Sequence, residues 1–554
     1  MDYAPGAGRS RFDMRAMGTR VGAVLRAHRG ALLWGALLFA VALLVRLPNL
    51  LQIPRYSDEG LEALWGWEIA LGHQWPLTAV DPYDGPLYAY LLAAILKVFG
   101  PNILLPRLMI AVAGALTVAA TYGLGRSMSS HRGGLFAAAI ALTSPTLIIL
   151  SHIGISNGLT PLFFTLTAAA LWKAGTTPGV TRASDWLLAL SGLLAALTLQ
   201  THPLSVFGLA GLALWFPIHT LWRNAPVGGA RSSLLRDLRA WLTRPGPYLA
   251  LGGFLLGYAP MLIANLRPDS PMFATATNRS YAFGPTLSLS SYLARLSEFA
   301  PRIARMIGGD ITSFVSPLLP VLLLAGLALV GMILALRRGN GLLVAVMLAT
   351  LVLMPFLIKE GTVGVTRRYA AYLIPLGAVA IGIAADWLIS RLGQFQARGR
   401  IYRLAPLSAL VVILALAAFP LVTLADYDAS TWNAGQTNQQ IFAMSVQAEQ
   451  AGACAGNLFV MDAGYGRYSF PTYYVSKSLD YVLTLDGCKH HMASRQQIQT
   501  RLAERRPTDW FIVLESDLPA FAGAGSLTPV LTINPYQDQK ATPFVLCAST
   551  TRPQ

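Results

Sequence analysis

Residues 31–47, ALLWGALLFAVALLVRL, form a membrane-length apolar segment, and Tyr56-Ser57-Asp58-Glu59-Gly60 follows it after a short connection. Acidic residues are scarce elsewhere, because only 26 of the 554 residues are Asp or Glu. Two adjacent carboxylates at a membrane–water boundary have two explanations. They supply a catalytic base or a metal ligand to a lipid-borne substrate, or they cap the N-terminus of a helix over Gly60–Ile69.

The composition defines the broad class of protein. Hydrophobic residues make up 54% of the chain, the mean hydropathy is +0.51, and many apolar runs are long enough to cross a hydrocarbon core. The chain therefore reads as a polytopic α-helical membrane protein. The net charge of +16 comes almost entirely from arginine, and the arginines lie in short loops between apolar runs. They indicate membrane topology and not a nucleic-acid partner.

Eleven apolar runs have the length of a membrane crossing. They lie near residues 31–47, 105–122, 134–150, 157–173, 186–200, 203–222, 247–265, 317–336, 341–358, 370–390 and 405–424. A further run, Leu87–Phe99, has only 13 residues and begins directly after Gly85-Pro86. We expect this run to be interfacial or re-entrant, because it is short for a crossing.

The distribution of arginine tests this count. With eleven crossings and a cytoplasmic N-terminus, one side of the membrane collects the basic arm 1–29 and most of the arginine-rich loops. These loops carry Arg126, Arg132, Arg182, Arg223, Arg231, Arg236, Arg239, Arg244, Arg337, Arg338, Arg391, Arg398, Arg400 and Arg403. If Leu87–Phe99 were a crossing, every later loop would change sides, against the positive-inside rule.

This topology places three regions outside the cytoplasm: the first outer loop 48–104, the connection 266–316 and the segment 425–554. The last of these reads as a small α/β domain of ordinary size. We predict its strands at Leu458–Met461, Tyr481–Leu485, Trp510–Leu514, Pro529–Ile533 and Phe544–Cys547, with a helix over Gln496–Arg505. All three cysteines, Cys454, Cys488 and Cys547, fall in this domain, so one disulfide is possible in an oxidising compartment.

The order of several short motifs resembles the GT-C superfold of membrane glycosyltransferases, and glycosyltransferase family 39 in particular. That family includes protein O-mannosyltransferases, with bacterial aminoarabinose transferases as close relatives. The resemblance covers residues 30–210 and the later crossings by general layout. It rests on Ser57-Asp58-Glu59, Tyr83-Asp84-Gly85-Pro86-Leu87-Tyr88-Ala89-Tyr90-Leu91-Leu92, Phe99-Gly100, Pro106-Arg107-Leu108, Tyr122-Gly123-Leu124-Gly125-Arg126 and Ser144-Pro145…Ser151-His152-Ile153-Gly154.

The resemblance implies a transmembrane catalytic domain over 30–424, whose first outer loop carries juxtamembrane helices. It also implies a polyprenyl-phosphate-linked sugar as donor and an inverting transfer on the outer face of the cell membrane. Asp58 would then be the catalytic base or would orient the acceptor, with Glu59 supporting it. A protein, a lipid or a glycan could each be the acceptor.

The donor phosphate needs positive charge at the outer boundary. Arg367 and Arg368 are the candidates, with Tyr369 beside them and His202 at similar depth; the alternative is that the pair is an ordinary anchor to lipid headgroups. Arg55 lies close to Asp58 in sequence and could pair with it and tune its ionisation.

A divalent cation such as Mg²⁺ or Mn²⁺ is a possible cofactor, and its ligands are left open. Many relatives carry an acid in the outer loop before the fourth crossing, whereas this chain has none between His152 and Asn157. Asn157 could hydrogen-bond a substrate or cap a helix, and the cap is the simpler explanation. Asp84 is one of the few other acids in the outer loops.

A transporter or lipid flippase without transferase chemistry is the rival class. Ion-coupled transporters usually carry ionisable groups at mid-membrane. The predicted crossings are nearly devoid of such groups, and Asp386 lies toward the cytoplasmic end of its crossing. A scaffold that merely displays the C-terminal domain is a third class, though eleven crossings would be an unusually large anchor.

Overall fold

The computed structural model describes residues 14–48, 50, 57–80, 83–177, 181–223, 239, 243–267, 288–309, 318–357, 366–394, 407–419, 421, 437–463, 470–504, 506, 508–522, 527–533 and 542–549. Within these ranges, the side chains of residues 14–28, 57–58, 222–223, 366–367, 437–439 and 470–474 are not described.

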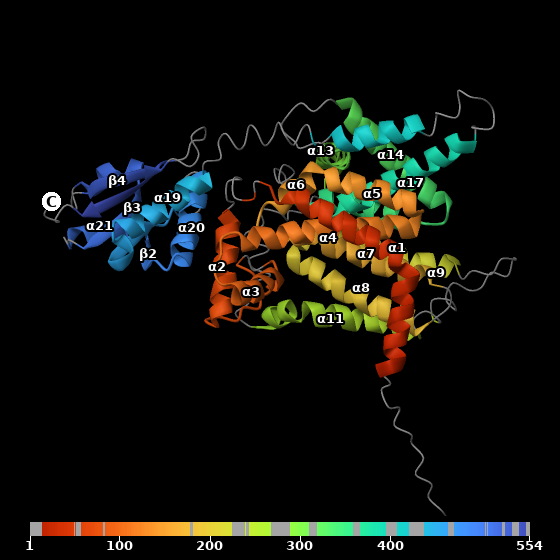
Figure 1. Cartoon of the computed structure of the whole chain (residues 1–554), viewed down its shortest axis with the longest axis horizontal. Coiled ribbons are helices and arrows are strands. Elements are labelled where there is room, and N and C mark those ends of the chain that lie inside the picture. Colours follow the sequence, from red (N-terminus) through yellow and green to blue (C-terminus); the bar gives the residue numbers. More distant parts are fainter. Residues whose placement is uncertain are drawn as a thin grey trace, which may run out of the picture.

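A bundle of apolar helices forms most of the molecule (Figure 1). Its helices are α1 (Met14–Arg46), α4 (Leu105–Met128), α5 (His131–Thr143), α6 (Pro145–Ser151), α7 (Thr160–Thr176), α8 (Arg182–Thr201), α9 (Val206–Arg223), α11 (Pro245–Leu266), α14 (Leu318–Arg337), α15 (Leu342–Leu357), α17 (Leu373–Gln394) and the helix Leu407–Phe419. Every predicted crossing coincides with one of these helices or with the bent pair α5–α6.

These helices fall into two groups by length and composition: those long and apolar enough to cross a membrane, and shorter ones. Among the described residues, seven helices are long and apolar enough to cross a membrane, or eight if α5 and α6, bent by 59°, form one crossing. The other three predicted crossings are shorter helices: α7, α15 and Leu407–Phe419. The prediction of a multi-pass helical protein is confirmed.

Helix α17 is the central helix of the bundle, since 78% of the residues in its most apolar stretch are buried. Small side chains allow this close packing, because the sequence reads Gly-Ala-Val-Ala-Ile-Gly-Ile-Ala-Ala over 377–385. A methyl group added at Gly331 of α14 would collide with the backbone carbonyl of Ala380 on α17. The outer helices instead present leucines outward, as expected for a lipid-facing surface.

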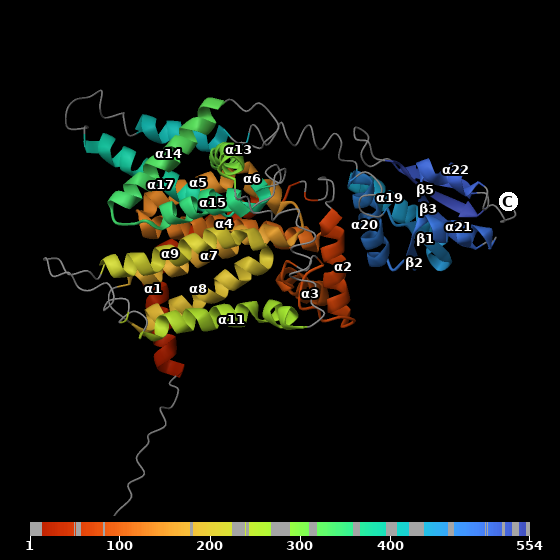
Figure 2. The same ribbon diagram turned by 180° about the vertical axis from the view of Figure 1, so that it is seen from behind.

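Two short helices cross one end of the bundle. Figure 2 shows α2 (Ser57–Leu71) and α3 (Leu87–Phe99) side by side at that end, between the bundle and the C-terminal domain. Helix α3 has the 13 residues of the predicted non-spanning run. The amphipathic helix α13 (Leu289–Ile307) packs against α14 and α15 and was not predicted.

The C-terminal part is an α/β unit built on a five-stranded mixed sheet of order β2-β1-β3-β5-β4. Strands β2, β1 and β3 pair in parallel, whereas β5 pairs antiparallel with both β3 and β4. Cys454 and Cys488 form a disulfide, and Cys547 is a buried free thiol. The elements are α19 (Thr437–Gln450), β1 (Asn457–Met461), α20 (Phe470–Leu485), β2 (His490–Ala493), α21 (Arg495–Ala503), β3 (Asp509–Leu514), β4 (Leu527–Ile533) and β5 (Phe544–Ser549).

Four of the predicted strands and the predicted helix are confirmed, but the strand prediction for Tyr481–Leu485 is wrong. That segment is the last part of α20, and the actual strand, β2, follows it. The buried residues Val475, Leu479 and Val482 recur at helical spacing and face the sheet core. The five residues 481–485 alone are too few to show this helical period.

Helix α20 has a second buried face. Tyr481 and Leu485 pack into a cluster with residues of α2, α3 and α4, so α20 joins the C-terminal domain to the end of the bundle. The two helices lie close together at Gly60 of α2, where an added Cβ would lie 2.9 Å from the carbonyl oxygen of Lys477. Glycine is therefore required at this crossing of the two helices.

We predict that Gly60→Ala weakens the docking of α20 on α2. Overpacking at a tight contact typically costs about 1–3 kcal/mol. Hydrogen–deuterium exchange should report faster exchange in α20 and in the first turns of α2. Gly123→Ala is the matched control, because a Cβ at that helical position meets nothing within 4 Å. Unchanged exchange in Gly60→Ala would contradict the docking described here.

Candidate active site

A buried ion pair joins α2 to the first turn of α4. The Nε of Arg107 lies 2.5 Å from Oε1 of Glu59 and its Nη2 lies 2.9 Å from Oε2, and neither side chain has exposed surface. Nη1 of Arg107 also donates to the carbonyl of Leu50, in the chain that leaves α1. Such a two-point contact satisfies both charges in a site without water.

The same carboxylate holds the loop that follows α6. The backbone N–H of Gly154 donates to Oε1 of Glu59 at 3.0 Å, and the hydroxyl of Tyr88 on α3 donates to the Gly154 carbonyl at 2.5 Å. One turn along α2, Glu62 accepts hydrogen bonds from the backbone N–H and hydroxyl of Ser156 at 2.8 and 3.1 Å. Residues 152–157 are thus fixed from two sides.

This loop contains buried polar atoms without a partner among the described residues. They are Nε2 of His152 and Oδ1 of Asn157, and each residue is only 5% exposed. Asn157 lies in the short helix η1 (Ser156–Leu159) and caps neither η1 nor α7, so the expected capping role is absent. Buried polar atoms usually have partners, so this loop is a candidate place for a ligand's polar groups.

His152 is neutral at physiological pH. Burial lowers its pKa to about 4; a hydrogen bond with the backbone of Arg46 opposes this shift, and the charges of Arg107 and Arg46 reinforce it. Since the backbone bond occupies the other ring nitrogen, Nε2 is the atom that remains for a ligand. A neutral imidazole here can accept or donate one hydrogen bond.

Arg46 ends α1 beneath this loop and is completely buried. Its Nε donates to the hydroxyl of Ser151 at 3.1 Å, and its Nη1 donates to the carbonyl of Ala42 at 3.1 Å. Neither Arg46 nor Arg107 was predicted as a site residue. The available signal was their position at the outer ends of predicted crossings, where basic residues run against the positive-inside bias.

A second cluster consists of His202, directly after α8, and of Arg368 and Tyr369, shortly before α17. The ring of His202 stacks on that of Tyr369, with centroids 4.1 Å apart and planes at 17°. Nη2 of Arg368 donates to the Tyr369 hydroxyl at 2.7 Å, and its guanidinium carbon lies 4.7 Å from the ring centre. Burial, reinforced by the charge of Arg368, lowers the pKa of His202 to about 3. The structure brings these three predicted residues together.

Hydrogen bonds join chain segments that lie next to the two clusters. The N–H of Gly85 donates to the carbonyl of Gln200 at 2.8 Å, which places the buried Asp84 beside the end of α8. The hydroxyls of Thr160 on α7 and Thr201 on α8 are 3.0 Å apart. Both clusters therefore belong to the end of the bundle that α2 crosses.

Three of the predicted site residues fall outside what the structure describes. Arg55 lies beyond the described residues, and for Asp58 and Arg367 only the backbone is described. Asp58 belongs to the first turn of α2, directly before the anchored Glu59. No group of three or more His, Cys, Asp or Glu side chains that could hold a metal occurs within the described part of the chain.

A family model matches part of the chain. The family model for dolichyl-phosphate-mannose-protein mannosyltransferase matches residues 82–228, which include α3, Arg107, the 152–157 loop and His202. No curated protein sequence gives a significant match.

Solved structures resemble the whole chain. The crystal structure of ArnT from Cupriavidus metallidurans bound to undecaprenyl phosphate has a TM-score of 0.63 and 15% identity, covering 94% of this chain and 99% of that one. Its apo form gives 0.60 and 14%, covering 95% and 100%. The oligosaccharyltransferase of Archaeoglobus fulgidus in complex with Zn and sulfate gives 0.50 and 13%, covering 88% and 69%. The chain has the GT-C fold of these enzymes.

We predict that Glu59→Gln destabilises the protein by roughly 3–5 kcal/mol, because it leaves the Arg107 charge buried without a counter-charge. Thermal unfolding in detergent measures the effect. Glu68→Gln is the control on the same helix, since Glu68 forms an exposed pair with His73 at 2.8 Å and should change stability little. Equal melting temperatures for the two variants would show that the buried pair does not hold α2.

Proposed function

We propose that this protein is a glycosyltransferase that moves a sugar from a polyprenyl-phosphate-linked donor to an acceptor on the extracytoplasmic face of the cell membrane. The observation that carries the proposal is the anchoring of α2, with Asp58 in its first turn, beside a buried loop with unpartnered polar atoms. The GT-C fold and the family-model match support it. In this account the ArnT relative, crystallised with undecaprenyl phosphate, indicates the class of lipid carrier.

Asp58 is the proposed catalytic base. It accepts the proton of the acceptor's nucleophilic group as that atom bonds to the anomeric carbon of the sugar. The bond from this carbon to the phosphate oxygen breaks at the same time, and the polyprenyl phosphate leaves with the bonding electrons. Glu59 is a positioning residue in this scheme, because its oxygens hold Arg107 and Gly154. Arg55 is proposed to pair with Asp58 and keep it ionised.

Arg368 and Arg367 are the proposed partners of the leaving phosphate. Preorganised positive charge stabilises the charge that develops on the phosphate in the transition state. The hydroxyl and the ring of Tyr369 both contact the guanidinium of Arg368 and hold it in place. The ring of His202 stacks on Tyr369 and holds that ring in turn. Asn157 and Asp84 are proposed to hydrogen-bond the sugar or the acceptor, and His152 joins them because of its unpartnered nitrogen.

We infer the side of the membrane from charge and from cysteine chemistry. Arginines at the C-terminal ends of α14, α17 and α9 support a cytoplasmic side at the end of the bundle away from α2. The basic composition of the N-terminal arm 1–29 is the reason to propose that the N-terminus is cytoplasmic as well. The disulfide of the C-terminal domain fits an oxidising compartment beside α2. The acceptor is proposed to dock between the first outer loop and the C-terminal domain, which covers residues 425–554.

A divalent cation, Mg²⁺ or Mn²⁺, is not required by this scheme. The carboxylate oxygens of Glu59 and Glu62 already accept hydrogen bonds from Arg107, Gly154 and Ser156, so this arrangement does not fit the oxygen-rich shell of a hard cation. No step of the proposed sugar transfer therefore involves a metal ion.

We predict that Asp58→Asn lowers sugar transfer about 10²- to 10⁴-fold, the usual contribution of a general base. Purified protein in detergent is given a panel of hexosyl and pentosyl polyprenyl phosphates with membrane extract as acceptor source. The release of polyprenyl phosphate is measured with and without EDTA. Glu68→Gln should retain activity, because that side chain is exposed on the far part of α2.

Full activity of Asp58→Asn would remove Asp58 from the catalytic role. Absence of release with every donor, from folded wild-type protein, would contradict the transferase proposal. The rival activity, lipid or lipid-linked sugar flipping without transfer, would then be measured in vesicles.

A further inference from the structure

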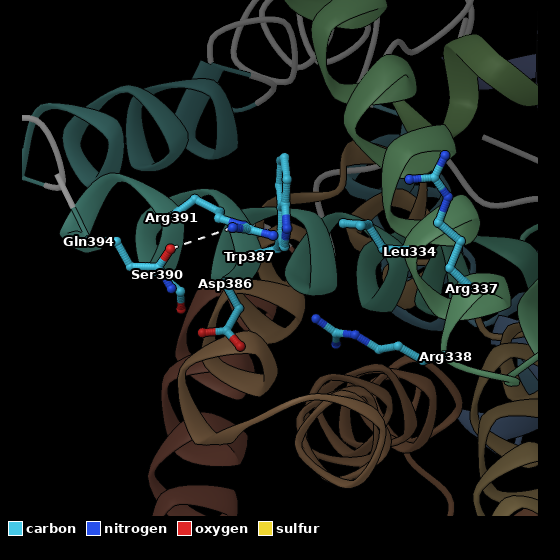
Figure 3. Close-up of a pocket in the computed structure, with 8 residues that line it drawn as sticks. All are labelled: Leu334, Arg337, Arg338, Asp386, Trp387, Ser390, Arg391 and Gln394. Carbon is cyan, nitrogen blue, oxygen red and sulfur yellow. Dashed lines mark hydrogen bonds between the residues drawn. The ribbon is translucent and has the colours of Figure 1, made fainter.

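A pocket of about 410 Å³ opens between α14 and α17, far from the candidate active site. Its walls are Leu334, Arg337, Arg338, Asp386, Trp387, Ser390, Arg391 and Gln394 (Figure 3). The pocket lies at the last turns of α17, whereas Tyr369 and Arg368 lie just before its first turn. The 22 residues of α17 span about 33 Å, so the two sites are at opposite membrane boundaries.

The only acid of this pocket is already neutralised. Oδ1 of Asp386 accepts a hydrogen bond from Nε of Arg132 at 2.8 Å, and Oδ2 accepts one from Ser129 at 3.1 Å. Arg132 also donates to the hydroxyl of Ser390 at 2.7 Å, which fixes the start of α5 against the end of α17. The carboxylate is therefore occupied before any pocket arginine reaches it.

The pocket arginines keep an excess of positive charge. Neither Arg337 nor Arg338 has an acidic partner within the part of the chain that the structure describes. Figure 3 shows Arg338 extending from α14 across the pocket toward Asp386. Among the described residues, the hydrogen-bond partner of Arg391 is a neutral group, the side-chain oxygen of Gln394 at 3.5 Å. Three arginines on two helices thus line one small cavity, and such a set of basic side chains suits a phosphate.

The surface next to the pocket is apolar. Leu329, Ile333 and Leu336 of α14 are 56%, 43% and 53% exposed and lie about one turn apart on one face of the helix. This face ends at Arg337, and the indole of Trp387 lines the pocket. Tryptophan at such a boundary is typical of the headgroup zone. A ligand that fits both features carries an anionic phosphate joined to acyl chains.

We propose that this pocket binds the phosphate headgroup of an anionic phospholipid in the leaflet opposite the candidate active site. Arg337 and Arg338 contact the phosphate, Arg391 closes the far side, and an acyl chain lies along Leu336, Ile333 and Leu329. The bound lipid joins α14 to α17, the buried central helix, and so stabilises the bundle.

Lipid binding is measured by native mass spectrometry of the detergent-purified protein with added phosphatidylglycerol, and separately with phosphatidylcholine. The wild type should bind phosphatidylglycerol selectively. We predict that the double variant Arg337→Gln/Arg338→Gln weakens this binding about 10- to 30-fold. Arg182→Gln is the matched control, because this exposed arginine starts α8 on the same side of the bundle and does not line the pocket.

Inorganic phosphate separates the lipid from a free anion. Phosphate at millimolar concentration should not displace phosphatidylglycerol, because it lacks acyl chains; displacement would overturn the assignment to a lipid. Binding by the double variant equal to that of the wild type would overturn the site itself. If the double variant does not fold, Arg391→Gln carries the same test, with an expected loss of about three- to tenfold. Sugar transfer should persist in these variants, so this test and that of Asp58 can fail separately.

Discussion

The ion pair between Glu59 and Arg107 is the interaction on which the arrangement of this protein depends. It joins α2 to α4, reaches the chain that leaves α1 through Leu50, and holds the loop after α6 through Gly154. A buried carboxylate is costly unless it is paired and hydrogen-bonded, and here both conditions hold. Because the pair is specific in geometry, α2 has one orientation across the end of the bundle, and the first turn that contains Asp58 is fixed with it.

The C-terminal domain packs on the same helix, α2. Gly60, one residue beyond the ion pair, lies against the backbone of α20 at Lys477. The C-terminal domain, which we propose forms the acceptor site with the first outer loop, is thus attached within a helical turn of the proposed base. A change in the docking of α20 would therefore act on the first turn of α2, which contains Asp58.

Much of this architecture could be predicted from local patterns. Hydropathy located the helices, and the short run Leu87–Phe99 is a separate helix of the predicted 13 residues. Its exclusion from the crossings and the side of the membrane given by the arginines stay predictions. The partners of Glu59 could not be predicted, because Arg107 is 48 positions away and only the folded bundle brings the two together. The strand assigned to Tyr481–Leu485 failed for a related reason. The end of α20 is buried on both faces, one by the sheet and one by α2, so these five residues alone do not show the helical spacing of the longer segment.

We propose that the lipid phosphate of the donor lies beside Arg368 and Tyr369, at the end of the bundle that α2 crosses. A cryo-electron microscopy map of the protein with bound polyprenyl phosphate tests this most directly. We predict phosphate density in contact with the Arg368 guanidinium and open toward the first turn of α2. Phosphate density only between α14 and α17, or at any position from which α2 cannot reach the carrier, would contradict it.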